Sequence, residues 1–178
     1  YGILRSVVHK LCGISGSESR GTQQERLRTR IAQHLAEPDR DRVVLFVGEL
    51  CNVPFPDAGK PMLQAARQDP KIMRDCLRRA FLDFLAAECA AAPVLLVLDD
   101  LQWGDELTVS VLDELVQVQS GASLFLLSFA RPEVHEVLPA VERPRQALEA
   151  RLRVLETRLL AQRPVIGRKG AVPVLARD

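Results

Sequence analysis

The chain has 178 residues, 47% hydrophobic and 26% charged, which suffices for one globular domain with a core. A formal net charge of +1 and 4% aromatic residues give no reason to expect a nucleic-acid partner, and no apolar run reaches the roughly 20 residues of a membrane span. The first residues show neither an initiator Met nor a signal-peptide layout, so we expect a piece of a longer, cytoplasmic protein.

Three segments with helical or apolar patterning come first. Residues 3–11 carry hydrophobic side chains at helical spacing and predict a helix that ends at Cys12 and Gly13. Residues 22–35 predict a second helix, and residues 41–50 form a strongly apolar segment. The loop at 15–21 has glycines but lacks the Gly-Lys-Ser/Thr ending of a phosphate-binding loop, so we interpret it as a linker.

A loop and a long helix follow in the middle of the chain. Residues 52–60 contain two prolines and a glycine, and a proline stands at position 54 where a phosphate-binding loop would need its first glycine. Asp69 suits a helix N-cap and Pro70 a first helical turn. We therefore expect a helix from residue 71 to about residue 91, ended by Pro93.

Two all-apolar segments predict a parallel sheet. Residues 94–98 and 123–129 have no polar alternation, and residues 106–119 between them have the pattern of a helix. A strand that is apolar on both faces is typical of a parallel sheet covered by helices on both sides. The order strand, helix, strand thus predicts an α/β fold with a doubly wound parallel sheet flanked by helices.

Charged residues follow both predicted strands. Ligands in α/β sheets bind beyond the carboxyl ends of the strands, where Asp99 and Asp100 stand after the first strand and Arg131 after the second. Adjacent carboxylates stay ionised together near a cation or hydrogen-bond donors. Mg²⁺ is a suitable cation, because it is commonly held by one or two carboxylates together with phosphate oxygens and water. In a site that hydrolyses a nucleoside triphosphate such as ATP, we expect Asp99 to hold Mg²⁺ directly or through water and Asp100 to contact the metal and orient the water that attacks the γ-phosphate. Arg131 would stabilise the charge of that phosphate.

Structural alternatives remain open for each of these positions. Asp99 and Asp100 would also suit a solvated loop between strand and helix, and Arg131 would suit a surface position at a strand end. We interpret Trp103 as a packing residue that braces the loop. Asp105 is either a helix N-cap or a further ligand.

The C-terminal part has a different character. Residues 142–163 predict an arginine-rich amphipathic helix whose apolar stripe consists of Leu148, Leu152, Leu155 and Leu159. Residues 164–178 contain glycines and prolines among basic residues, and we expect a disordered tail. The four cysteines lack the spacing of a zinc site, which favours free thiols in a reducing compartment.

The acidic segment also carries a family resemblance. Residues 95–105, LLVLDDLQWGD, resemble the Walker B segment of AAA-type signalling ATPases of the STAND class, which usually have His where Gln102 stands and Ala where Gly104 stands. Residues 128–133, SFARPE, resemble the next strand of that family. Residues 67–70, RQDP, followed by residues 78–85, RRAFLDFL, are similar to the ATPase region of large bacterial serine/threonine protein kinases.

The resemblance implies a partial AAA/STAND ATPase domain over residues 1–141. Its sheet would be an incomplete, P-loop NTPase-like one with a helical C-terminal extension, and Mg²⁺ and ATP would be the cofactors of the complete parent domain. The family's Walker A loop is missing from the sequence, and we expect it upstream of Tyr1 in a longer reading frame. The signature motifs of the kinase domain itself are also missing.

Two functions follow, from different classes. The chain is either a fragment of an ATP-hydrolysing regulatory switch in a kinase-linked bacterial signalling protein, or a nucleotide-independent interaction domain derived from such an ATPase. Its partners would then be other domains of the parent or separate proteins, with no nucleic acid and no membrane. A third reading, a metal site for phosphoester hydrolysis at Asp99 and Asp100, lacks the further carboxylates or histidines of two-metal sites.

Overall fold

The structure is a computed structural model that describes residues 2–118 and 123–131. The predicted helix at 142–163 and the tail at 164–178 lie outside these ranges. In chain order the elements are α1 (Gly2–Cys12), α2 (Arg20–His34), α3 (Asp39–Leu50), α4 (Pro61–Gln68), α5 (Pro70–Ala91), β1 (Val94–Leu98), the 3₁₀ turn η1 (Leu101–Trp103), α6 (Glu106–Val118) and β2 (Leu124–Ser128). The described part is therefore an α/β structure, mostly helical, with a small parallel sheet.

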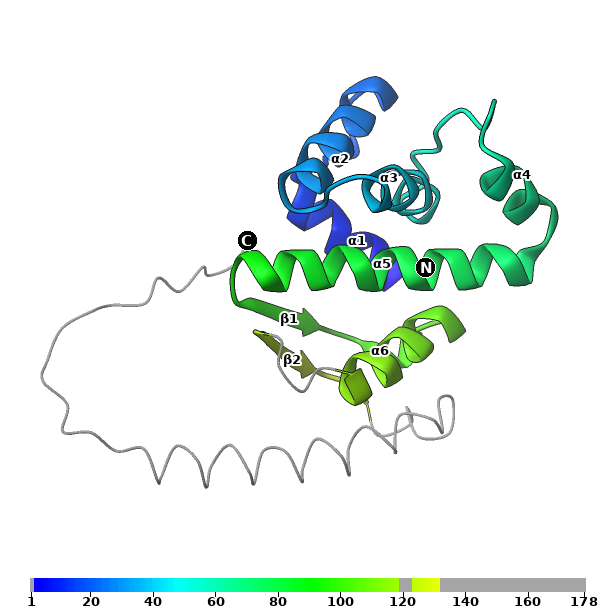
Figure 1. The fold of residues 1–178 in the computed structure, drawn as a ribbon. Helices are drawn as coiled ribbons and strands as arrows, with labels where there is room; N and C mark the ends of the chain where they lie inside the picture. Colours follow the sequence, from blue (N-terminus) through cyan, green and yellow to red (C-terminus); the bar gives the residue numbers. More distant parts are fainter. Residues whose placement is uncertain (1, 119–122, 132–178) are drawn as a thin grey trace, which may run out of the picture.

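The long helix α5 lies between two parts of the molecule. Helices α2, α3 and α4 lie on one side of it, β1, β2 and α6 lie on the other, and α1 begins behind α5 and runs toward α2 (Figure 1). Its inner side chains, among them Phe81, Phe84 and Leu85, are buried in one continuous core. Ion pairs link it to both parts, because Asp83 accepts from Arg42 of α3 at 2.6 Å and Arg74 lies 2.6 Å from Glu106 of α6.

The first and third helices end in the same backbone motif. Gly13 has a positive φ of 63°, and the N–H of Ile14 donates to the carbonyl of His9 at 2.8 Å. Asn52 has a φ of 61°, and the N–H of Val53 donates to Gly48 at 2.8 Å. Both are Schellman endings, which need a residue that tolerates the left-handed region. The helix end that the sequence predicts at Cys12 and Gly13 is confirmed.

The beginning of α5 is also confirmed. Asp69 is the N-cap, and its Oδ1 accepts from the backbone N–H of Lys71 at 2.8 Å, while Pro70 occupies the first turn. The apolar segment at 41–50 is the helix α3. The short helix α4 was not predicted, since its eight residues offer little periodicity; Pro61 at its first turn was the available signal.

The loop at 52–60 is held against α3 by close packing. A Cβ on Gly48 would lie 2.6 Å from a ring atom of Phe55 and 2.9 Å from the carbonyl oxygen of Val53, so only glycine fits there. Arg67 of α4 donates to the carbonyl of Phe55 at 2.9 Å and to Glu49 at 2.6 Å. The loop is thus a structural connection between α3 and α4.

The sheet is parallel, as the sequence predicts. Val94 pairs with Leu124 and Leu98 with Ser128, and α6 provides the connection between the strands. Backbone bonding continues past the strands, because the N–H of Phe129 donates to Leu98 at 2.8 Å. None of the helices in the described ranges has both the length and the hydrophobicity of a membrane span.

The expectation that helices cover both faces of the sheet is wrong for the described residues. Leu96 and Leu98 are buried at 5% and 2% exposure and join the core with α5 and α6. Leu95, in contrast, is 62% exposed and Val97 is 49% exposed. The two helices that flank the sheet in sequence pack against each other on one side, so the alternate residues of β1 face outward.

Candidate functional site

The structure brings the predicted site residues to one edge of the sheet, the edge at which the carboxyl ends of both strands lie. Asp99 and Asp100 follow β1 directly, and Arg131 lies three residues after β2. The N–H of Leu101 donates to the carbonyl of Phe129 at 3.0 Å, so the loop that carries the acids is bonded to the segment that leads to Arg131. Because the strands are parallel, their carboxyl ends share this edge, as expected for a ligand site.

Asp100 adopts an unusual backbone conformation. Its φ of 55° and ψ of 43° lie in the left-handed region, which is uncommon for residues other than glycine but is adopted by Asp and Asn more often than by most. Its N–H donates to Oδ1 of Asp99 at 3.0 Å. Such conformations occur preferentially at functional sites, where the surrounding structure maintains them. Here the next residue, Leu101, is only 3% exposed and anchors the turn in the core.

The two acids fit the metal-binding part of a nucleotide site. Both are exposed at the sheet edge, and one oxygen of Asp99 accepts the backbone bond described above. Mg²⁺ is commonly held by one or two carboxylates together with phosphate oxygens and water. Within the described ranges, no three His, Cys, Asp or Glu side chains form a ligand set, so the metal would depend on a nucleotide for its other ligands.

Asp105 is the N-cap of α6. Its Oδ1 accepts from the backbone N–H and from the hydroxyl of Thr108, both at 2.9 Å. Burial acts to raise the pKa of Asp105, but the hydrogen bonds that its carboxylate accepts, including those from Thr108, outweigh burial and lower it. Of the two roles left open by the sequence, the structure supports the cap.

Trp103 does not brace the loop. Its side chain is 77% exposed, so the predicted packing role is wrong. The 3₁₀ turn explains the difference, since Leu101 takes the inward position and the residue two places later points outward. Leu101 is therefore the residue that anchors the loop, which the sequence interpretation did not identify. The sequence feature that could have indicated it is an aliphatic residue directly after the two acids.

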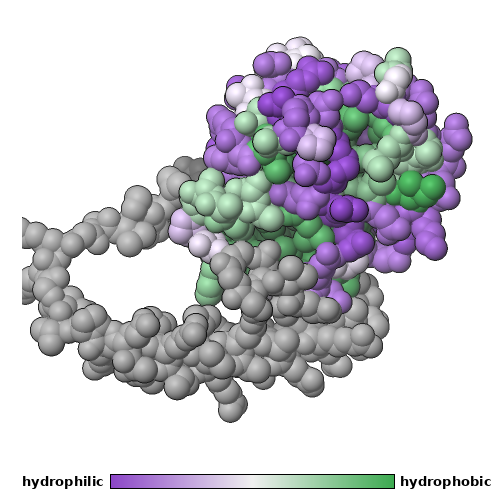
Figure 2. Space-filling model, viewed as in Figure 1, coloured by the Kyte–Doolittle hydropathy of each residue, from purple (hydrophilic) through white to green (hydrophobic). Residues whose placement is uncertain are grey.

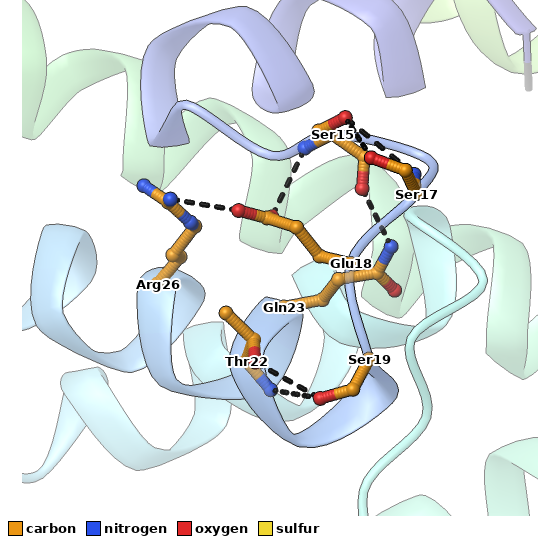
Figure 3. A network of polar contacts seen from close by, with 7 residues as sticks. All are labelled: Ser15, Ser17, Glu18, Ser19, Thr22, Gln23 and Arg26. Atoms are coloured by element: carbon orange, nitrogen blue, oxygen red, sulfur yellow. Dashed lines mark hydrogen bonds and ion pairs between the residues drawn. The ribbon is translucent and has the colours of Figure 1, made fainter.

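The glycine-containing loop at 15–21 is closed by its own side chains (Figure 3). The N–H of Ser15 donates to Glu18 at 3.1 Å, and Glu18 also pairs with Arg26 at 2.7 Å. The backbone bond from Ser15 contributes most to lowering the pKa of Glu18. Ser19 caps α2 by accepting from the N–H of Thr22 at 3.2 Å. These bonds support the interpretation of the loop as a linker.

A depression between α1 and α2 is lined by Lys10, Arg26 and Arg30 among others. Two of these cations already have partners, because Arg26 pairs with Glu18 and the Nε of Arg30 donates to the buried Glu88 at 2.9 Å. The depression belongs to helices on the other side of α5 from the sheet (Figure 1). It is therefore separate from the acidic edge and poorly suited to an anion.

The cysteines are free thiols, as predicted. Burial raises the pKa of Cys12 and of Cys51 to about 12. A thiol with such a pKa is protonated at neutral pH and is a poor nucleophile and a poor metal ligand. Cys12 and Cys51 therefore contribute to packing in the core.

Comparison with known proteins identifies no relative. No family model matches the chain, and no curated protein or solved structure matches it either.

Proposed function

We propose that residues 1–141 belong to an ATP-binding and ATP-hydrolysing regulatory module of a multidomain, cytoplasmic, bacterial signalling protein linked to a serine/threonine kinase. The main support for the proposal is that Asp99, Asp100 and Arg131 all follow the carboxyl ends of two paired parallel strands. The left-handed Asp100 adds a conformation typical of functional sites. The wider fold would be that of a P-loop NTPase of the AAA/STAND type.

Each residue has a role in this proposal. Asp99 would hold Mg²⁺ directly or through water, and the ion would supply positive charge to offset that of the ATP phosphates. Asp100 would contact the metal and orient or deprotonate the attacking water, and Arg131 would stabilise charge on the γ-phosphate. The backbone amides and lysine that hold phosphates in this class of enzyme are missing from the sequence and would come from another part of the parent protein.

The sheet edge also suits a switch. The bond from Leu101 to Phe129 couples the acidic loop to the segment before Arg131. Leu101 is buried in the core that also contains side chains of α5 and α6. A shift of the acidic loop on loss of the γ-phosphate would therefore change the packing of both helices. Nucleotide state would thus set the conformation that neighbouring domains of the parent detect.

The test of this proposal is ATP turnover in the full-length gene product that contains these residues. Asp99→Ala should abolish turnover while the far-ultraviolet circular dichroism and melting temperature stay near those of the native protein. Asp75→Ala, which removes an exposed carboxylate from α5, is the matched control and should leave turnover unchanged. Normal hydrolysis in Asp99→Ala would refute the assignment of the acidic edge.

Calorimetric titration of Mg·ATP into the 178-residue chain determines how much of the site it holds. Binding with a Kd of about 1 μM, about −8 kcal/mol, would mean that another element of this chain replaces the phosphate-binding loop. No detectable heat would mean that the acids form half of a site.

The second candidate is a nucleotide-independent interaction domain derived from a P-loop ATPase. The exposed face of β1 and β2 favours it, because a group of exposed apolar side chains is typical of a contact surface. Absence of Mg·ATP binding in the full-length protein would favour this candidate over the first.

A further inference from the structure

The outward face of the sheet is a contiguous apolar surface. It consists of Leu95, Val97, Phe125, Leu127 and Phe129, here called the open sheet face. Leu95 lies beside Phe125 and Val97 beside Leu127 in the strand register. Their exposed fractions run from 39% for Leu127 to 62% for Leu95. Five large apolar side chains grouped in this way indicate a surface that another element covers.

The helical part of the molecule offers no comparable group among the described residues. Its large exposed hydrophobic side chains are Met62 on α4 and Ile72 on α5, at 56% and 41% exposure. Isolated exposed apolar residues of this kind are ordinary. In Figure 2 hydrophilic residues dominate the upper part of the visible face, where the helices lie. The sheet is thus where an apolar partner fits.

We propose that residues 145–162 of the same chain form a helix that packs on the open sheet face. The side chains that make the contact are Leu148, Leu152, Leu155 and Leu159, which share one stripe of a helix. The stripe spans about 16 Å at the rise of an α-helix. The apolar row from Phe125 to Phe129 spans about 13 Å at the rise of a strand. The two surfaces therefore match in length as well as in character.

The chain can reach this position. Residues 132–144 connect the end of the described segment at Arg131 to the proposed helix, and 13 residues extend to at most about 43 Å. A helix of 18 residues is about 27 Å long. The connection is long enough to bring either end of the helix to the edge where β2 ends, so the packing direction is not restricted by the linker.

Charge favours the same arrangement. Residues 145–162 contain four arginines and two glutamates, a formal net charge of +2. The sheet edge next to the open face carries Asp99 and Asp100. Opposite charges on the two surfaces favour their association and orient it. This packing does not require nucleotide, so it stands or falls separately from the proposed ATPase function.

Photo-crosslinking on the full 178-residue chain tests the proposal. Benzoylphenylalanine replaces Phe125, whose exposed ring tolerates a larger side chain, and mass spectrometry locates the crosslink. A mixture of ¹⁴N- and ¹⁵N-labelled chains distinguishes contacts within one molecule from contacts between two. We expect crosslinks to residues 148–159, with both peptides carrying the same isotope.

Two substitutions in one helical turn supply the matched variants. Leu155→Glu places a carboxylate on the stripe and should lower the crosslink yield about tenfold, because the charge would have to be buried on an apolar surface. Thr157→Glu adds the same charge roughly opposite the stripe and should leave the yield unchanged. Circular dichroism should show that the helices remain intact in both variants.

Three other results would each overturn the proposal. Mixed-isotope crosslinks would show that a second copy covers the face. Crosslinks to residues outside 145–162 would identify another segment as the cover. A failure to crosslink any part of the chain would show that the face is open to solvent in this polypeptide.

Discussion

The two parts of the molecule that meet at α5 differ in how completely they bury their apolar surface. On the helical side, Leu4, Leu27, Phe46 and Leu63 each have at most 1% exposure. On the sheet side, alternate residues of both strands are exposed, and the acids lie at the open edge. A region that buries its apolar side chains has little exposed apolar surface for binding another element. A sheet with one exposed apolar face and charged residues at the ends of its strands can bind both a partner and a ligand.

The largest expected effect comes from truncating an aromatic side chain at the junction of the two parts. Phe84 of α5 is 1% exposed, and Phe84→Ala should lower the free energy of unfolding by about 3–5 kcal/mol, because a cavity remains in the core. Trp103→Ala on the sheet side removes a side chain that is 77% exposed and lies outside the open sheet face, and it should change the free energy of unfolding by less than about 1 kcal/mol. Urea denaturation measures both, and similar losses would contradict the distinction between the parts.

The second prediction concerns the close approach in the helical part. Gly48→Ala should destabilise the protein by about 1–3 kcal/mol, because the new methyl group would overlap the ring of Phe55 and the backbone at Val53. Gly21→Ala is the control, since the nearest atom to its Cβ is the hydroxyl oxygen of Ser19 at 3.9 Å. Gly21 lies in α2, where alanine is the better helix former. Thermal unfolding that shows equal effects would rule out tight packing at Gly48.

A third prediction tests the ion pair that joins α2 to α5. Glu88 is 4% exposed and Arg30 is 34% exposed, so Glu88→Gln should weaken the fold by about 1–2 kcal/mol as the guanidinium loses its charged partner. Glu37→Gln breaks the exposed pair with Arg40 and should change stability by less than about 1 kcal/mol. Chemical denaturation of the two variants gives the comparison. A larger loss for Glu37→Gln would be the opposite of the expected order.

The smallest expected effect comes from removing the N-cap of α6, on the sheet side of the molecule. Asp105→Ala should destabilise the protein by about 1 kcal/mol through loss of the α6 N-cap. The pKa of Asp105 is lowered in the folded protein from its ordinary 3.8, so its carboxylate stabilises the fold above pH 3.8. That contribution disappears as the pH falls through the lower folded-state pKa.

The matched variant for this pH dependence is Asp105→Asn, which keeps a side-chain acceptor but does not titrate. The difference in unfolding free energy between native protein and Asp105→Asn should shrink as the pH falls below 3.8. Denaturation curves across this range provide the measurement. A difference that stayed constant with pH would show that the charge of Asp105 plays no part in the cap.

Much of the fold could be predicted because its signals are local. Asp69 followed by Pro70 marks the start of α5, and Gly13 marks the end of α1. Apolar runs on either side of a helical pattern indicated two parallel strands, and parallel strands necessarily place Asp99 and Arg131 at one edge. Each of these inferences depends on residues a few positions apart or on a general rule of chain connection.

Other features depended on packing between distant segments. Leu95 and Leu96 are adjacent leucines, yet Leu95 is 62% exposed and Leu96 is 5% exposed, because α5 and α6 lie on only one side of β1. Glu88 can be buried because Arg30, 58 positions away, neutralises its charge. Sequence alone indicated most of the helices, the two strands of the described part and the acidic edge, since these follow from local chemistry, although it did not indicate α4. Tertiary structure decided which side of each element is buried, since burial depends on which elements pack against it.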